Sequence, residues 1–121
     1  MSRNTQTVQS YLAGFQAGGR DQILGCLTDD IRWTVFGNYQ VQGKAAYNEH
    51  ITEPGFSSPP TLEIVRLVEE DNTVMAELYG EVRADDGTLL RMAMAEVFVM
   101  RDGLICERRA FVIPLRENDY R

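Results

Sequence analysis

His50 is the only histidine of the chain, and imidazole is the side chain whose ordinary pKa lies closest to neutrality. Tyr47, His50 and Ile51 are spaced so that they share one face of a helix predicted over residues 44–51. On an apolar face, the imidazole could take a proton from carbon beside a carbonyl group. The other interpretation is a surface helix residue that hydrogen-bonds Asn48 or Glu53.

Arg108 is the second candidate, because it is a cation within a strand predicted over residues 104–113. Strand alternation gives one face that carries Cys106, Arg108, Ala110 and Val112, and another that carries Ile105, Glu107, Arg109 and Phe111. If the first face is the apolar interior, the guanidinium of Arg108 requires an anion. If the register differs, Arg108 faces solvent.

The anion beside Arg108 is either a carboxylate of a neighbouring strand or an oxygen atom of a ligand held by two hydrogen bonds. The candidate carboxylates are Glu77, Glu81 and Glu96. Glu96 is notable because it interrupts the apolar segment AMAEVFVM. It is therefore either paired inside the protein or placed on an interface.

The elements that must position these residues begin with helices. An apolar stripe at helical spacing predicts a helix over residues 4–17, ended by two glycines; its members are Val8, Tyr11, Leu12 and Phe15. A short second helix is predicted over residues 20–27, and a turn over residues 28–30. Ile31, Trp33 and Val35 then alternate with polar residues, which indicates a strand with one buried face.

Beyond a loop predicted at residues 54–60, the pattern changes to long strands. We expect them over residues 61–69, 73–82, 89–100 and 104–113. Acidic turns join these strands, so they form an antiparallel meander. Such a sheet needs one covered face, and the three helices provide the cover. The predicted class is α+β, with one domain over residues 1–121.

Composition excludes several classes of function. The 121 residues are 44% hydrophobic and 25% charged, which is typical of a globular domain. A net charge of −6 argues against nucleic acid as a partner. We expect a cytoplasmic protein without membrane association, because the chain has no long apolar run and no apolar leader. Cys26 and Cys106 are isolated, so we expect ordinary thiols, no metal site and no cofactor.

Three segments in this order, YLAGFQAGGRDQILGCLTDDIRWTVFG, VQGKAAY and EVFVMRDGLICERRAF, carry a resemblance to a known family. The chain resembles the SnoaL-like and ketosteroid-isomerase-like members of the NTF2-like superfamily over nearly its whole length. The resemblance implies a cone, in which a strongly curved antiparallel sheet wraps around the N-terminal helices. It also implies a mostly apolar pocket inside the cone and frequent dimerisation through the outer face of the sheet.

The resemblance indicates which ketosteroid-isomerase groups the chain has and which it lacks. Tyr11 corresponds to the oxyanion-hole tyrosine of those enzymes. The position of their general-base aspartate is occupied by Val35, or by Thr34 if the register shifts by one residue. Their second oxyanion acid corresponds to Met92 or Ala93, so both acids are missing.

The chemistry of limonene-epoxide hydrolases is excluded more firmly, because Leu78, Gly80 and Ala110 occupy the positions of their catalytic residues. His50, in contrast, stands where relatives commonly have an apolar aromatic residue that faces the pocket. The resemblance thus implies Tyr11 and His50 as catalytic candidates. The residues implied to bind the ligand are Trp33, Val35, Tyr47, Arg108 and Ala110.

Two functions from different classes remain open. One is an isomerase or cyclase that acts on a small apolar carbonyl compound through Tyr11 and His50. The other is a non-catalytic ligand-binding or dimerisation module that has lost the family's catalytic carboxylates. Both predict a homodimer through an outer sheet face that carries Met92, Met94, Phe98, Ile105 and Phe111. The aromatic residues expected in the core or the pocket wall are Phe15, Trp33, Phe36, Tyr39 and Phe56.

Overall fold

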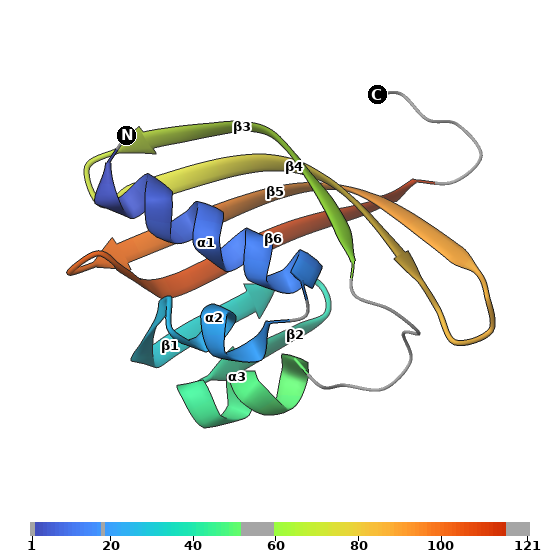
Figure 1. The fold of residues 1–121 in the computed structure, drawn as a ribbon, viewed down its shortest axis with the longest axis horizontal. Helices are drawn as coiled ribbons and strands as arrows, with labels where there is room; N and C mark the ends of the chain where they lie inside the picture. The colour runs from blue at the N-terminus through green and yellow to red at the C-terminus, as the bar shows by residue number, and fades with distance from the viewer. Residues whose placement is uncertain (1, 18, 52–59, 116–121) are drawn as a thin grey trace.

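The computed structural model describes residues 2–17, 19–51 and 60–115. One six-stranded sheet curves around the first helix, and two shorter helices lie beside it (Figure 1). The helices are α1 (Arg3–Ala17), α2 (Arg20–Leu24) and α3 (Lys44–Ile51). The strands are β1 (Leu27–Val35), β2 (Tyr39–Gln42), β3 (Thr61–Glu70), β4 (Thr73–Arg83), β5 (Leu89–Arg101) and β6 (Leu104–Leu115). The predicted α+β cone is confirmed.

The helix α1 buries the apolar stripe expected from the sequence and is fixed to β3 at both ends. The Ser2 hydroxyl caps its first turn by accepting a hydrogen bond from the Thr5 backbone N–H, at 3.0 Å. The hydroxyls of Ser2 and Thr5 also donate to the Glu69 carboxylate at the far end of β3. At the other end of the helix, Gln16 Oε1 accepts from the Leu62 backbone N–H, at 3.1 Å. The helix therefore lies along the strand.

The sheet has the strand order β2-β1-β6-β5-β4-β3. The strands β3 to β6 form the antiparallel meander expected from their turns. The pair β1–β6 is parallel, which corrects the expectation of a wholly antiparallel sheet, and it sets Trp33 opposite Arg108. The strand β2, which pairs with β1, was not predicted. Its 4 residues are too few to establish an alternating pattern.

The segment between α2 and β1 also differs from the prediction. The helix ends at Leu24 and the strand begins at Leu27, so the predicted helix over residues 20–27 is too long. The predicted turn over residues 28–30 is wrong, because these residues continue the strand. The Asp30 carboxylate is satisfied there by the Thr28 hydroxyl, at 2.8 Å, and by Arg101 Nη2, at 2.5 Å.

The concave face of the sheet carries the core, and a bulge decides which side chains of β6 join it. Val99 lies opposite Glu107 and Met100 lies opposite Ile105, so Cys106 is the extra residue. Ile105 therefore points into the core together with Arg108, against the simple alternation expected from the sequence.

The predicted set for the outer face is wrong for three residues. Met94, Phe98 and Ile105 belong to the buried core. Met94 and Phe98 share the face of Glu96, which is the concave face. The set is also wrong in part for Met92, which packs partly buried against the core. Phe111 is 42% exposed on the outer face, as expected.

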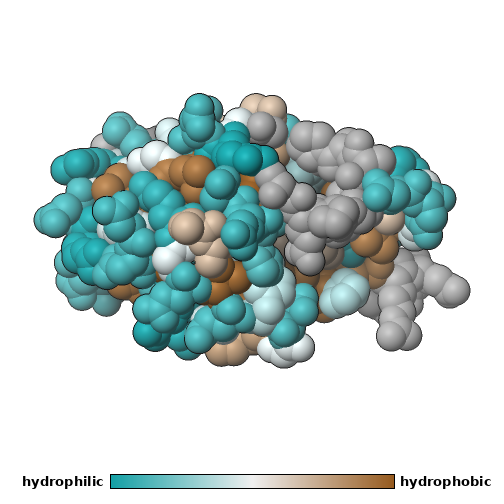
Figure 2. Space-filling view, turned by 90° about the horizontal axis from the view of Figure 1, so that it is seen from below, coloured by the Kyte–Doolittle hydropathy of each residue, from teal (hydrophilic) through white to brown (hydrophobic). Residues whose placement is uncertain are grey.

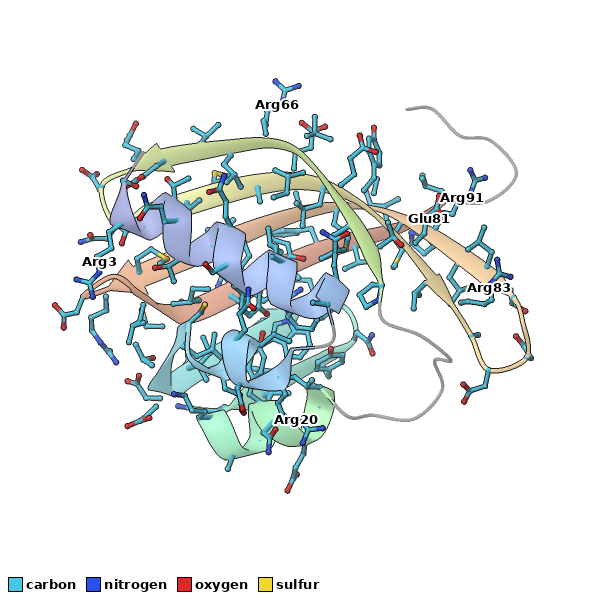
Figure 3. All side chains as sticks on the ribbon, in the orientation of Figure 1. Arg3, Arg20, Arg66, Glu81, Arg83 and Arg91 are labelled. Atoms are coloured by element: carbon cyan, nitrogen blue, oxygen red, sulfur yellow. The ribbon has the colours of Figure 1, made fainter. Side chains whose placement is uncertain are left out.

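The side of the molecule that is seen from below carries mostly hydrophilic side chains, with hydrophobic ones between them (Figure 2). Charged side chains such as Arg20 and Arg66 point away from the body of the protein (Figure 3). Phe36, expected in the core or the pocket wall, is 44% exposed and stacks on Phe111, with 4.7 Å between ring centroids. Phe56 and most of the predicted loop lie outside the described residues. No helix in the described part of the chain could span a membrane.

Candidate functional site

Arg108 is held by a carboxylate of the neighbouring strand. Its Nε donates to Glu96 Oε1 at 2.6 Å, and its Nη2 donates to Oε2 at 2.9 Å, which is the fork geometry of a strong ion pair. The Glu96 side chain is 2% exposed and the Arg108 side chain 11%. Among the three carboxylates considered from the sequence, Glu96 is therefore the partner.

Two tyrosines complete the cluster. Nη1 of Arg108 donates to the Tyr11 hydroxyl at 2.5 Å and to the Tyr47 hydroxyl at 3.1 Å. The two hydroxyls are also hydrogen-bonded to each other. Both tyrosines are fully buried. Groups from α1, α3, β5 and β6 thus converge on one guanidinium, and we call Tyr11, Tyr47, Glu96 and Arg108 the arginine cluster.

Aromatic rings enclose the guanidinium of Arg108. Its Cζ lies 4.5 Å from the ring centroid of Trp33 and 5.4 Å from that of Phe15. Trp33 reaches this place because the parallel register of β1 and β6 sets it opposite Arg108. Cation–π contacts of this kind are worth about 2 kcal/mol when the cation is desolvated. These contacts favour a fixed position for the Arg108 side chain, which is the partly exposed member of the cluster.

The cluster keeps definite protonation states. Burial raises the pKa of Tyr11 well above its usual range, although Arg108 acts in the opposite direction. Burial likewise raises the pKa of Tyr47. Burial also acts to lower the pKa of Arg108, but the attraction of Glu96 and of the phenols outweighs it and holds that pKa well above its usual range. The cluster therefore combines neutral phenols with a charged guanidinium at neutral pH.

His50 lies near this cluster and contacts the Trp33 ring, which also covers Arg108. Its ring centroid is 4.6 Å from that of Tyr39 and 5.9 Å from that of Trp33. The Trp33 indole therefore contacts both His50 and Arg108. That Tyr11, His50 and Arg108 surround one cavity stays a prediction.

The remaining sequence candidates lie close to the same place. Val35 of β1 is the register partner of Ala110 of β6, and both side chains are buried. Tyr47 is in contact with Trp33, with 4.7 Å between ring centroids. Sequence reasoning did not single out Phe15 as a partner of the guanidinium. Its position four residues after Tyr11, on the same helical face, was the available signal.

Two buried polar atoms have no hydrogen-bond partner within the described residues: the indole Nε1 of Trp33 and the Oδ1 of Asn48. Buried polar groups are nearly always paired in native proteins, so an unpaired one calls for an explanation. The Trp33 indole N–H is the more informative, because the same indole covers Arg108. Within the described ranges, no group of His, Cys, Asp and Glu side chains could hold a metal ion.

Comparison with protein families identifies the family of the chain. The family model of the SnoaL-like domain matches residues 8–108, so the chain belongs to the SnoaL-like family. The comparison with curated protein sequences finds no significant match.

Three solved structures illustrate the range of the fold. An LEH-like epoxide hydrolase of M. tuberculosis is 17% identical, with a TM-score of 0.82, over 92% of this chain and 83% of that chain. SalBIII, an epoxide hydrolase/cyclase-like enzyme of pyran ring formation in salinomycin, is 21% identical, with a TM-score of 0.79, over 91% and 90%. A provisionally assigned ketosteroid isomerase from Kribbella flavida is 16% identical, with a TM-score of 0.77, over 97% and 82%. At these identities the similarity shows the fold alone.

Proposed function

We propose that the chain binds a small, largely apolar carbonyl compound inside the cone and acts on it as an isomerase or cyclase. The observation that carries the proposal is the arginine cluster, a set of oriented hydrogen-bond donors on an otherwise apolar concave face. Buried donors of this kind stabilise the negative charge that develops on a carbonyl oxygen when a neighbouring proton is removed.

A count of the donor hydrogen atoms in the cluster favours a ligand group that accepts hydrogen bonds. The two tyrosine hydroxyls share one hydrogen bond, and both oxygens accept from Arg108, so one phenolic hydrogen is left over. The Trp33 indole N–H is a second unused donor among the described residues. Because donors are left over, a carbonyl oxygen complements the cluster better than a group that must itself donate.

In this proposal, the ligand oxygen meets the partly exposed edge of Arg108, and Tyr11 supports the developing enolate as a member of the cluster. His50, whose ring also contacts the Trp33 indole, is the base that takes the proton from carbon. Trp33, Val35 and Ala110 form the apolar wall. We include in the proposal a homodimer through the outer sheet face and a cytoplasmic location.

Two measurements with the same ketones test binding and catalysis. Trp33 is the only tryptophan, so quenching of its fluorescence by cyclohexanone or 2-octanone reports occupancy of the site. Proton exchange at the carbon beside the carbonyl, followed by NMR in deuterated water, reports enolisation. We expect His50→Ala to reduce the exchange rate at least 100-fold, the usual contribution of a general base, while ketone binding persists.

Tyr11→Phe should also slow the exchange, by less than the loss of the base. Ala45→Ser, on the exposed side of the same helix as His50, is the matched control and should exchange at the parent rate. An exchange rate that is equal in the parent and in His50→Ala would refute the assignment of the base.

The second candidate, a non-catalytic binding module, is favoured by one observation: both tyrosine hydroxyls are fully buried and mutually bonded. In that case the cluster only orients Arg108 toward an acceptor on the ligand. Ketone binding in the parent protein without any proton exchange above the buffer rate would decide for this candidate.

A further inference from the structure

Gly80 marks an unusual place on the concave face of the sheet. It lies in the interior of β4 between Leu78 and Val82, whose side chains point into the core. Glycine weakens a strand interior, and it often marks a place where another group approaches the backbone closely. Because Gly80 does not have a positive φ angle, the reason for glycine is space rather than backbone conformation.

That space is filled by flexible side chains. A Cβ atom on Gly80 would lie 2.7 Å from the terminal methyl of Met94, 3.4 Å from Cδ2 of Leu62 and 3.6 Å from the terminal methyl of Met92. Methionine is unbranched and has a polarizable thioether, so its end group can move without a backbone shift. The volume over Gly80 can therefore be vacated by side-chain rotation alone.

This place continues directly from the arginine cluster. Met94 precedes Glu96 by two residues on the same face of β5, and Met92 precedes Met94 by two more. The distance from Glu96 to the level of Met92 is about 13 Å along the strand. Leu62 and Met92 are only partly buried. The β4–β5 hairpin extends past the end of α1 (Figure 1), so this end of the concave face is less covered by that helix.

We propose that Gly80, Met92 and Met94 form an adjustable wall that receives the apolar part of the ligand while its carbonyl oxygen lies at Arg108. The inference rests on the proposed function and narrows the substrate class to carbonyl compounds with an extended aliphatic or alicyclic part. The thioether ends of Met92 and Met94 rotate to make room, and Gly80 leaves the backbone of β4 open to contact.

A homologous series of 2-alkanones, from 2-butanone to 2-dodecanone, tests the wall through the fluorescence of Trp33. Each buried methylene contributes about 0.8 kcal/mol, so the dissociation constant should fall about fourfold per carbon until the chain extends beyond the wall. Gly80→Ala should end this gain at a shorter chain, because its Cβ takes space beside Met94. Met94→Ala should extend it to a longer one, with the shortest ketones unaffected in both variants.

Met75→Ala is the matched control, because Met75 lies on β4 but is 49% exposed on the outer face. Met94→Leu conserves the side-chain volume and with it the fold. This variant therefore tests the wall even if Gly80→Ala destabilises the protein too far. It should weaken binding of branched ketones more than that of linear ones. Chain-length profiles that are the same in the parent and in all three wall variants would overturn this inference and leave ketone binding intact. A parent protein that binds no ketone would instead remove the proposed function and, with it, this inference.

Discussion

Glu96 and Arg108 depend on each other, because both side chains are largely removed from water, with 2% and 11% of their surfaces exposed. Removing one partner of a buried ion pair leaves the other uncompensated, at a cost of about 3–5 kcal/mol, whereas replacing both with apolar residues is often nearly neutral. The pair also fixes the fork of the guanidinium relative to the rings of Trp33 and Phe15. It therefore supports the position of Arg108 as well as its charge.

We predict that Glu96→Ala lowers the free energy of unfolding by about 3–5 kcal/mol, measured by urea denaturation at neutral pH. The double variant Glu96→Met with Arg108→Met should recover most of this loss, because no uncompensated charge remains inside. It should also abolish quenching of Trp33 by ketones. Equal losses of stability in the single and double variants would contradict the interpretation of Glu96 as the compensating charge.

At the scale of the elements, the link between β1 and the end of β5 depends on pH. Hydrogen bonds from Arg101 and Thr28 lower the pKa of Asp30 from its ordinary value of 3.8 to about 2. A carboxylate whose pKa is lowered in the folded state stabilises that state above the unfolded pKa. This contribution is lost as the pH falls from about 4 to about 2.

We therefore predict that Asp30→Asn lowers the melting temperature at neutral pH and that this difference disappears as the pH approaches 2. Differential scanning calorimetry from pH 7 to pH 2 measures it. Asp29→Asn is the control, because the Asp29 side chain is fully exposed and its Oδ1 lies as far as 3.8 Å from Lys44 Nζ. The prediction fails if the Asp30→Asn difference is constant across this range.

The elements also show what the sequence could predict and why. The strands β3 to β6 and the helices α1 and α3 were predictable, because their periodicity is regular and turn residues separate the strands. The pairing of β1 with β6 was not, since residues so far apart in sequence leave no local turn signal. The bulge at Cys106 was also invisible, and it reversed the predicted direction of Ile105.

The arginine cluster was predictable only in part, for a related reason. Tyr11, Arg108 and Glu96 each stood out as a polar residue in an apolar segment, and the resemblance placed Tyr11 near the interior. Their hydrogen bonds depend on how strands pair in space, so the sequence left Glu77, Glu81 and Glu96 as alternatives. Glu96 occupies the concave face together with Met94 and Phe98, and only the tertiary structure shows this.

At the scale of the whole molecule, the outer face of the sheet carries exposed apolar side chains on β3, β4 and β6. Phe111 is 42% exposed, Ile113 62%, Met75 49% and Val68 56%. Cross-strand register sets Phe111 opposite Ala95 on β5, and Phe36 stacks on its ring. An apolar surface shared by several strands is typical of a protein interface.

We predict a homodimer through this face at micromolar concentration, measured by sedimentation velocity. Phe111→Arg should produce monomers, because a charge at the centre of the contact would have to be desolvated without a partner. Ala45→Arg, on the exposed side of α3, is the control and should remain dimeric. A parent protein that sediments as a monomer would contradict the prediction.

The central position of β6 in the sheet has a consequence for protein synthesis. This strand lies between β1 and β5, although among the strands of the described residues it is the last to leave the ribosome. Until it emerges, the β1–β2 hairpin and the β3–β5 meander have no strand that joins them, and each exposes an unpaired edge. Such edges pair readily with other chains. Translation speed over residues 104–115, or a chaperone bound to the nascent chain, is therefore expected to affect how much of this protein reaches its native state.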